Sequence, residues 1–268
     1  MEAIKDIVNK TDVVITSEAE NVCAICGKPY KLKVFLQGSR GLYLPDCDCR
    51  EKEEQNKRNR QQKLKKYAEL KEKYKQANFP PIFAGKRLFP VYTLKGKKIR
   101  NGLTCEHAEL MQEYVKYFRP RRAKGFHYVG SVGNGKTTLA VCIGKELIKK
   151  GYSVRFMTFS QCMRILQSTY STKNPKSFDE QIEEFLKIDL LILDDFGRDG
   201  YKEQKLADAF EFLNALYNNR NNVILTSNPE MIEKIKTIPD FGAMLDRFHK
   251  MAKLLKFTNP SFRREGAK

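Results

Sequence analysis

The sequence contains no apolar run of 18 residues, so it offers no segment that would cross a membrane as a helix. The N-terminus lacks the apolar core of a secretory leader, and we therefore expect a cytoplasmic protein without membrane contact. Disulfides are rare in that compartment, so the seven cysteines are interpreted as metal ligands or free thiols. No internal repeat is present, which argues against a repeat architecture.

Acidic residues are too few to balance the basic ones. The 268 residues include 50 Lys and Arg against 32 Asp and Glu, a net charge of +18. Residues 51–127 hold 21 basic and eight acidic groups, whereas residues 1–50 are balanced. A nucleotide alone does not require this charge, so the surplus favours nucleic acid as a partner. The alternative is a basic surface that serves only solubility.

Composition divides the chain into three parts. Residues 1–50 form a small module with four of the cysteines, and residues 79–268 form a larger domain. The stretch 51–78 between them is densely charged and is predicted to be a helical linker, with a merely solvated linker as the alternative. Phe79-Pro80-Pro81 ends it. Its apolar stripe is narrow and consists of Leu64, Tyr67, Ala68 and Tyr74.

Short apolar segments alternate with helical stretches in the larger domain. Such strands fit a parallel sheet that helices cover on both faces, so the predicted fold class is α/β. The predicted strands are Phe126–Val129, Val154–Thr158, Leu190–Leu193, Val223–Thr226 and Leu254–Phe257. The predicted helices are Cys105–Phe118, Thr137–Lys149, Ser160–Tyr170, Phe178–Phe185, Glu203–Asn219 and Met231–Ile235.

Residues 130–137 fit the pattern G-x-x-x-x-G-K-[ST], the phosphate-binding loop of nucleoside triphosphatases. An expected strand precedes the loop and an expected helix follows it, as the motif requires. Lys136 is predicted to reach the β- and γ-phosphates of ATP, and Thr137 to hold Mg²⁺. The predicted nucleotide-binding residues are Gly130, Ser131, Val132, Gly133, Asn134, Gly135, Lys136, Thr137, Thr138 and Asp194.

A second apolar strand ends in the acid pair Asp194 and Asp195. Asp194 is predicted to bind Mg²⁺ with Thr137 or through water, and Asp195 to orient or deprotonate the attacking water. The alternative is a strand that merely ends in a polar turn. Asn228 follows another buried strand, where its side chain would touch the γ-phosphate or the water, although turns favour Asn for their own reasons.

Two later arginines, Arg247 and Arg263, are further candidates for the catalytic site. An arginine stabilises the charge of phosphoryl transfer, either from its own chain or from a neighbouring subunit. On spacing alone, each is also compatible with an ordinary surface position.

The cysteines of the N-terminal module form two close pairs. Cys23 and Cys26 are separated by 20 residues from Cys47 and Cys49, and no histidine lies nearby. Four thiolates close a tetrahedral structural zinc site, and a module with little core needs such a link. An iron–sulfur cluster or unligated thiols are the alternatives. The isolated Cys105, Cys142 and Cys162 are predicted to be small buried apolar residues.

The order of motifs resembles the replicative helicase loaders of the DnaC and DnaI type, AAA+ ATPases related to the transposition helper IstB. YVGSVGNGKTTLA is followed by DLLILDDFG, ILTSN, MLDRF and SFRR. The cysteine module resembles the N-terminal metal-binding domain of DnaI-like and phage loaders. The resemblance implies an AAA+ P-loop ATPase domain preceded by a small zinc-binding module that docks on the helicase. Since five residues follow Arg263, no C-terminal helical lid is expected.

The resemblance also implies individual roles. Asn228 takes the sensor 1 place, Arg247 the place of an arginine finger acting on the next subunit, and Arg263 the sensor 2 place. Many AAA+ proteins have Glu where this chain has Asp195, whose side chain reaches less far toward the attacking water.

The resemblance further implies contacts to single-stranded DNA. Residues 160–184 are longer than one helix requires, and the corresponding region of the family faces the strand. Aromatic rings that stack on bases, with cations for phosphates, suit such a partner, whereas an ordinary mixed surface is the alternative. The predicted contacts are Arg164, Tyr170 and Lys173, with Lys176 nearby, and Arg198, Tyr201 and Lys202 after the acid pair.

The sequence therefore predicts a loader of the hexameric replicative helicase. Subunits would assemble head to tail, bind ATP and Mg²⁺ between them, and use slow hydrolysis as a switch. The first alternative is an IstB-like helper that binds duplex DNA and a transposase. The second is a zinc-containing nucleic-acid adaptor whose ATP site does not turn over. The cysteine module favours the loader.

Overall fold

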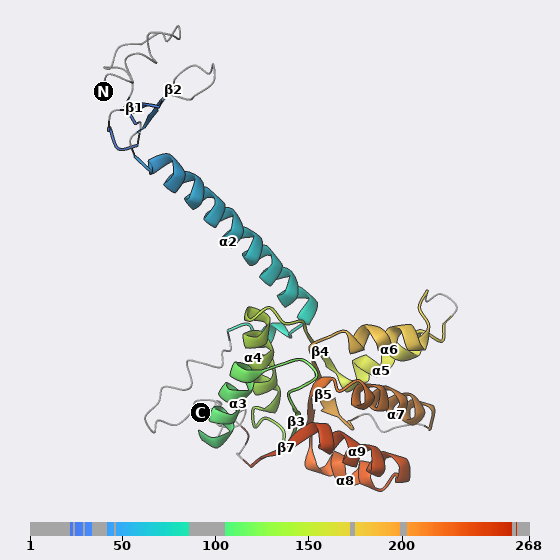
Figure 1. Ribbon diagram of the computed structural model, residues 1–268. Helices are drawn as coiled ribbons and strands as arrows, with labels where there is room; N and C mark the ends of the chain where they lie inside the picture. Colours follow the sequence, from blue (N-terminus) through green and yellow to red (C-terminus); the bar gives the residue numbers. More distant parts are fainter. Residues whose placement is uncertain are drawn as a thin grey trace. The chain divides into compact units, whose positions relative to one another are not determined.

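The computed structural model describes residues 22–23, 25–28, 30–33, 42–45, 47–85, 105–171, 175–198, 203–258 and 261 (Figure 1). The chain divides into two compact units, one up to Ala68 and one from Glu69 on. In the first unit, β1 (Tyr30–Lys33) pairs antiparallel with β2 (Leu42–Pro45). Across the described ranges, no helix combines the length and the apolar character needed to span a bilayer.

The charged stretch forms α2 (Cys49–Ala77), a continuous helix of 29 residues. This confirms the helix predicted there. Acid–base pairs four residues apart support its first turns, with Lys52 Nζ 2.7 Å from Asp48 Oδ2. Its last turns pack into the core of the second unit, where the Tyr74 hydroxyl donates to the Lys145 carbonyl at 3.2 Å.

The second unit contains a five-stranded parallel sheet with the order β4-β5-β6-β3-β7. All five predicted strands are present, and four of them are longer than predicted. Because the strands are parallel, the phosphate loop after β3, the acid pair near the end of β5 and Asn228 after β6 lie at the same edge of the sheet. The strands are β3 (Gly125–Gly130), β4 (Val154–Thr158), β5 (Leu190–Phe196), β6 (Asn222–Ser227) and β7 (Ala252–Phe257).

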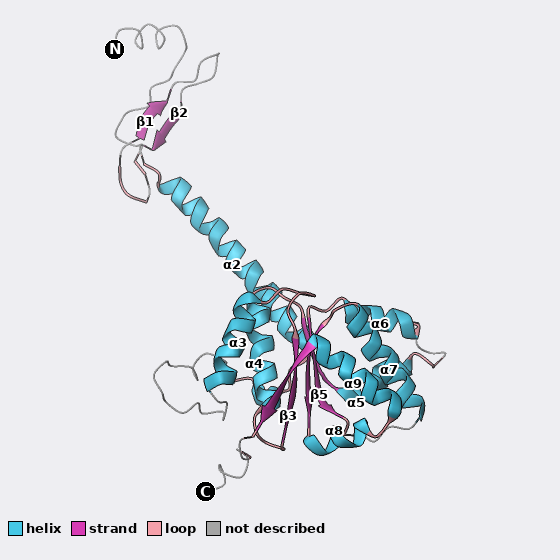
Figure 2. Ribbon diagram, turned by 60° about the horizontal axis from the view of Figure 1, so that its bottom comes forward, coloured by secondary structure: helices cyan, strands magenta, loops and turns pink. Residues whose placement is uncertain are grey.

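Helices cover both faces of this sheet (Figure 2). One face carries α3 (Cys105–Tyr117) and α4 (Lys136–Lys149), and the short η2 (Pro81–Phe83) precedes them in the chain. Strand residues alternate between the two cores, so Leu190 and Ile192 face this side while Leu191 and Leu193 face the other. The other face carries α5 (Phe159–Ser168), α6 (Phe178–Leu186), α7 (Glu203–Asn218), α8 (Pro229–Lys236) and α9 (Pro239–Met251).

Helix α9 is absent from the elements predicted from the sequence, and α8 begins two residues before its predicted start. Both helices carry proline in their first turn, Pro229 and Pro239. Proline is tolerated there because the first helical N–H groups have no partner within the helix. Of the isolated cysteines, Cys142 and Cys162 are buried as predicted. The side chain of Cys105 lies outside the described residues.

Candidate nucleotide and metal sites

The phosphate loop connects β3 to α4, as its motif requires. Gly133 and Gly135 have φ values of 85° and 93°, a left-handed conformation that favours glycine. Gly135 immediately precedes the first residue of α4. Turns of this kind direct successive backbone N–H groups inward, and the helix N-terminus adds partial positive charge. The loop is therefore built to surround an anion such as a triphosphate.

Lys136 lies at the centre of this loop. Its Nζ donates to the carbonyl oxygens of Gly130 and Ser131, each at 2.7 Å, and to Asn134 Oδ1 at 3.1 Å. The side chain is buried, so the ammonium is held where phosphate oxygens would replace these carbonyls. Ser131 and Val132 are exposed at the tip of the loop.

The predicted magnesium ligands lie together. Thr137 Oγ1 donates to Asp194 Oδ1 at 2.7 Å, and Thr226 Oγ1 donates to the same oxygen at 2.5 Å. Burial raises the pKa of the Asp194 carboxyl, against the opposing effect of the two hydroxyls. A divalent cation would favour the ionised form, so this hydroxyl and carboxylate pair suits Mg²⁺.

Asp194→Asn should raise stability while it removes activity. A raised folded pKa means that the ionised carboxyl destabilises the native state. This cost is absent at acidic pH and appears as the pH rises through the raised pKa. Without nucleotide, we expect the variant to melt about 2–4 °C higher for each kcal/mol relieved. Mg-ATP should then stabilise only the wild type, and the exposed Asp179→Asn serves as control. A variant that hydrolyses ATP normally would contradict the assignment.

The second acid, Asp195, lies in a β-bulge. Leu193 pairs with Leu225 and Phe196 with Ser227, so β5 has one residue more than β6 over this stretch. Asp195 has a φ of 56°, and its N–H donates to Thr226 Oγ1 at 3.1 Å. Bulges redirect side chains, which places this acid differently from the next residue of a regular strand.

Thr226 thus donates to the Asp194 carboxylate and accepts from the Asp195 backbone N–H, and it was not among the site residues predicted from the sequence. Its signal was a hydroxyl in an otherwise apolar, buried strand. The structure also brings the predicted DNA contact Arg198 to the catalytic candidate Asp195, with Nη1 2.9 Å from Oδ2. Arg198 is 71% exposed, so this ion pair is worth at most about 1 kcal/mol.

Asn228 is the N-cap residue of α8, yet its side chain makes no capping hydrogen bond. Asparagine is among the residues preferred at this position because its side chain usually caps the helix. Here the Asn228 amide does not form that hydrogen bond. The residue is half-buried at the end of β6, which is compatible with the predicted sensor role.

Two histidines, the buried His127 and the half-buried His249, form a polar chain with Ser227 at the end of β6. His127 Nδ1 lies 2.9 Å from His249 Nε2, and His127 Nε2 lies 2.6 Å from Ser227 Oγ. Burial, with the adjacent imidazole, lowers the pKa of His127 to about 3, so the ring is neutral at physiological pH. The chain links β3, the end of β6 and α9, the helix that carries Arg247.

Of the two candidate arginines, the structure describes Arg247 but not Arg263. Arg247 is exposed on α9, and its Nη1 donates to Asn214 Oδ1 on α7 at 3.2 Å. Its guanidinium is therefore on the surface of the chain. Arg263 lies outside the described residues.

The predicted DNA contacts are dispersed. Arg164 is exposed on α5. The Tyr170 hydroxyl donates to the buried Asp208 at 2.7 Å, and its ring stacks on Phe178 with centroids 5.7 Å apart. Tyr170 therefore also has a packing role, although 57% of it is exposed. Lys176 pairs with Glu184 at 2.6 Å. The other predicted contacts, Lys173, Tyr201 and Lys202, lie outside the described residues.

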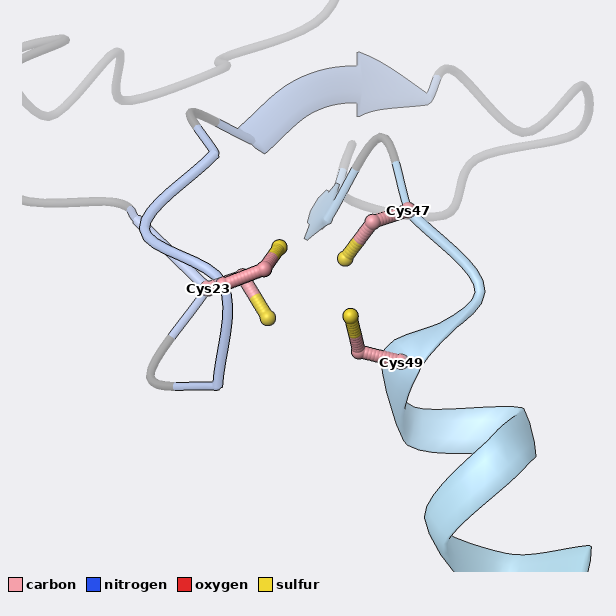
Figure 3. A group of neighbouring side chains, drawn as sticks. Cys23, Cys47 and Cys49 are labelled. Atoms are coloured by element: carbon pink, nitrogen blue, oxygen red, sulfur yellow. The ribbon is translucent and has the colours of Figure 1, made fainter.

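The four clustered cysteines form a possible metal site. The sulfur atoms of Cys23, Cys26, Cys47 and Cys49 all lie within 4.8 Å of one another. Figure 3 shows the Cys23, Cys47 and Cys49 sulfurs facing the same space. Tetrahedral zinc with bonds of about 2.3 Å separates its sulfurs by roughly 3.8 Å, so a small contraction would complete the cage.

Local structure favours the thiolate form of Cys23 and disfavours that of Cys49. The Gly27 N–H donates to the Cys23 carbonyl at 2.8 Å, closing a turn in which Gly27 has a φ of 70°. Hydrogen bonds from the backbone N–H groups of Cys26 and Ile25 lower the pKa of Cys23 to about 7. The Cys26 and Cys47 thiols raise the pKa of Cys49 to about 12. Neighbouring thiolates disfavour one another, and a divalent metal would reverse that effect.

Comparison with known proteins supports the ATP site. A sequence model of the family described as IstB-like ATP binding protein matches residues 115–268. An insertion sequence ATP-binding protein of Sinorhizobium fredii is 29% identical over 150 residues, which are 54% of this chain and 49% of that protein. The replication initiator DnaA of Lactiplantibacillus plantarum is 26% identical over 181 residues, 63% of this chain and 38% of that protein. The matches span about half or less of these relatives.

Solved structures confirm the predicted AAA+ P-loop fold. The crystal structure of the DnaC helicase loader superimposes with a TM-score of 0.55 at 21% identity, covering 66% of this chain and 99% of that one. The crystal structure of DnaI gives a TM-score of 0.53 at 20% identity, covering 68% of this chain and 95% of that one. These superpositions show a shared fold.

Proposed function

Because the chain belongs to the family of IstB-like ATP-binding proteins, we propose that it is a cytoplasmic ATPase that loads a replicative DNA helicase onto single-stranded DNA. The observation that carries the proposal is the pairing of a four-thiol module with an ATPase unit of the loader fold. The superpositions cover nearly all of the solved DnaC and DnaI chains, which supports the proposal further.

The site geometry suggests how ATP is handled. The loop N–H groups and Lys136 bind the phosphates, while Thr137 and Asp194 hold Mg²⁺, whose charge supports phosphoryl transfer. Asp195 orients the attacking water, and Asn228 reports the state of the γ-phosphate. Asp195 has a short side chain that Arg198 already binds, so hydrolysis is slow and ATP serves mainly as a switch.

Assembly completes the site. Arg247 projects from α9 and acts on ATP bound by the next subunit of a head-to-tail oligomer, while Arg263 acts on the ATP of its own chain. ATP aligns the subunits so that their weak DNA contacts add along one strand. The cysteine module, with zinc in place, grips the hexameric helicase.

A second candidate is a transposition helper that binds duplex DNA and a transposase. The family description and the insertion sequence protein of Sinorhizobium fredii favour it. Both functions use the same ATPase core, so only the partner separates them.

The deciding experiment is co-purification with the replicative helicase of the same source. We expect the wild type and Lys136→Ala to retain the helicase when zinc is present, and Cys47→Ser/Cys49→Ser to lose it. Loading is then measured as helicase bound to a circular single strand, which should require an intact Lys136. Failure of the wild type to bind the helicase, together with capture of a transposase on duplex DNA, would replace the loader by the helper.

A further inference from the structure

One stretch of α2 carries cations without acids. Between Glu54 and Glu69 the sequence has six basic residues and no acidic one. Lys57, Arg60, Lys63 and Lys66 follow one another at intervals of three within the helix. Residues three apart are neighbours on a helix surface, so these four form a cationic ridge that rises about 13 Å along α2 and winds about half-way around the helix axis.

In the first turns of α2, by contrast, basic side chains form ion pairs with acids nearby in the sequence. There Lys52, Arg58 and the first residue of the ridge, Lys57, each pair with an acid four residues before, at 2.7, 3.8 and 2.8 Å respectively. Further along α2, within the described part of the chain, the structure contains no ion pair to Arg60, Lys63, Lys65 or Lys66. All of these side chains are exposed.

Repulsion between the cations of the ridge destabilises α2, and a helix that serves only as a solvated linker gains nothing from it. Like charges three or four residues apart destabilise a helix by about 0.2–0.5 kcal/mol per pair. A linker kept only for solubility would mix both signs, as the first turns of α2 do. A polyanion bound along the ridge would convert this repulsion into attraction.

Exposed apolar side chains adjoin the cations. Leu64 is 61% and Tyr67 68% exposed, and they lie three residues apart on the side of the helix that Arg60 occupies. Phosphates alone would not need them, but unpaired bases stack on an aromatic ring. An acidic protein surface would match the charge but would leave the Tyr67 ring without a specific partner.

We propose that residues 57–67 of α2 form a binding site for single-stranded nucleic acid, with Lys57, Arg60, Lys63 and Lys66 on phosphates and Tyr67 stacked on a base. The inference rests on the proposed function for its ligand, but it adds a contact outside the ATPase unit. We expect this contact not to depend on ATP, because residues 57–67 belong to the first compact unit and the phosphate loop to the second.

The test is titration of a labelled single strand against the full chain at several salt concentrations, with and without an ATP analogue. We expect Lys57→Gln/Lys63→Gln/Lys66→Gln to weaken ATP-free binding roughly tenfold or more at low salt. The slope of log affinity against log salt should fall by up to about 2. Tyr67→Ala should weaken it about 5- to 100-fold. Glutamine is a good helix former, so the helix itself is retained.

The control neutralises three exposed lysines elsewhere, Lys187, Lys234 and Lys253, with the same change in net charge. Equal losses in the control and the ridge variant, or equal effects on duplex and single strands, would overturn the inference. The proposed function fails separately. In that case ATP would not strengthen DNA binding by the wild type, whatever the ridge variant does.

Discussion

Replacing Arg247 by Ala is expected to slow ATP hydrolysis by about 10³ while nucleotide binding stays nearly intact. The side chain is exposed and binds Asn214, so its loss should not disturb the phosphate loop of its own chain. Its charge is needed only when phosphoryl transfer begins in a neighbouring subunit. Phosphate release and fluorescent nucleotide binding measure the two properties. Lys250→Ala, on the exposed end of the same helix, is the matched control.

Mixing shows whether Arg247 acts across a subunit boundary. Chains with Arg247→Ala and chains with Lys136→Ala are each inactive, for different reasons. In mixed oligomers, some interfaces combine an intact loop with an intact arginine, so activity should return in part. The trans role is wrong if mixed oligomers form, as seen by differently labelled chains, and hydrolysis stays at the level of the separate variants.

Removing the metal is expected to unfold the cysteine module and leave the ATPase unit folded. Structural zinc supplies an apparent 10–16 kcal/mol at neutral pH, whereas the module has little core of its own. Metal analysis should find one zinc per chain. Chelation should abolish the ordered signals of the module and spare the thermal transition of residues 69–258.

Cysteine substitutions provide the control for this experiment. Cys47→Ser should release the zinc, while Cys142→Ala, at a buried cysteine of the other unit, should retain it. A coloured iron cluster, or protein that is gently purified without metal and still has a folded module, would refute the zinc assignment.

Much of the second unit followed from local patterns. Parallel strands buried on both faces are apolar throughout, so Leu190–Leu193 and its equivalents were recognisable without knowledge of their neighbours. The phosphate loop was recognisable because its chemistry requires glycines and a lysine at fixed spacing. The spacing of the cysteine pairs likewise predicted a group of four sulfurs, and in the structure these four sulfurs lie close together.

The His127 contacts and the bulge at Asp195 could not be predicted, because both depend on the order of the strands in the sheet. His127 meets Ser227 and His249 because β3 lies between β6 and β7, and no local pattern contains that order. The bulge at Asp195 is invisible for the same reason, since it exists only relative to β6. Helix α9 was overlooked because its proline reads as a break unless it is recognised as a first-turn residue.

The phosphate loop also forms a hydrogen bond to the end of β7, a strand far along the chain. Asn134 Nδ2 donates to the Phe257 carbonyl at 3.1 Å, across 123 residues of sequence. Gly130 packs so close to the same oxygen that a Cβ there would approach it to 2.5 Å. A nucleotide that immobilises the loop therefore also immobilises the end of β7. Amide hydrogen exchange in Leu255–Phe257 should slow when ATP binds, which makes this strand an intrinsic reporter of nucleotide occupancy that needs no label in the site.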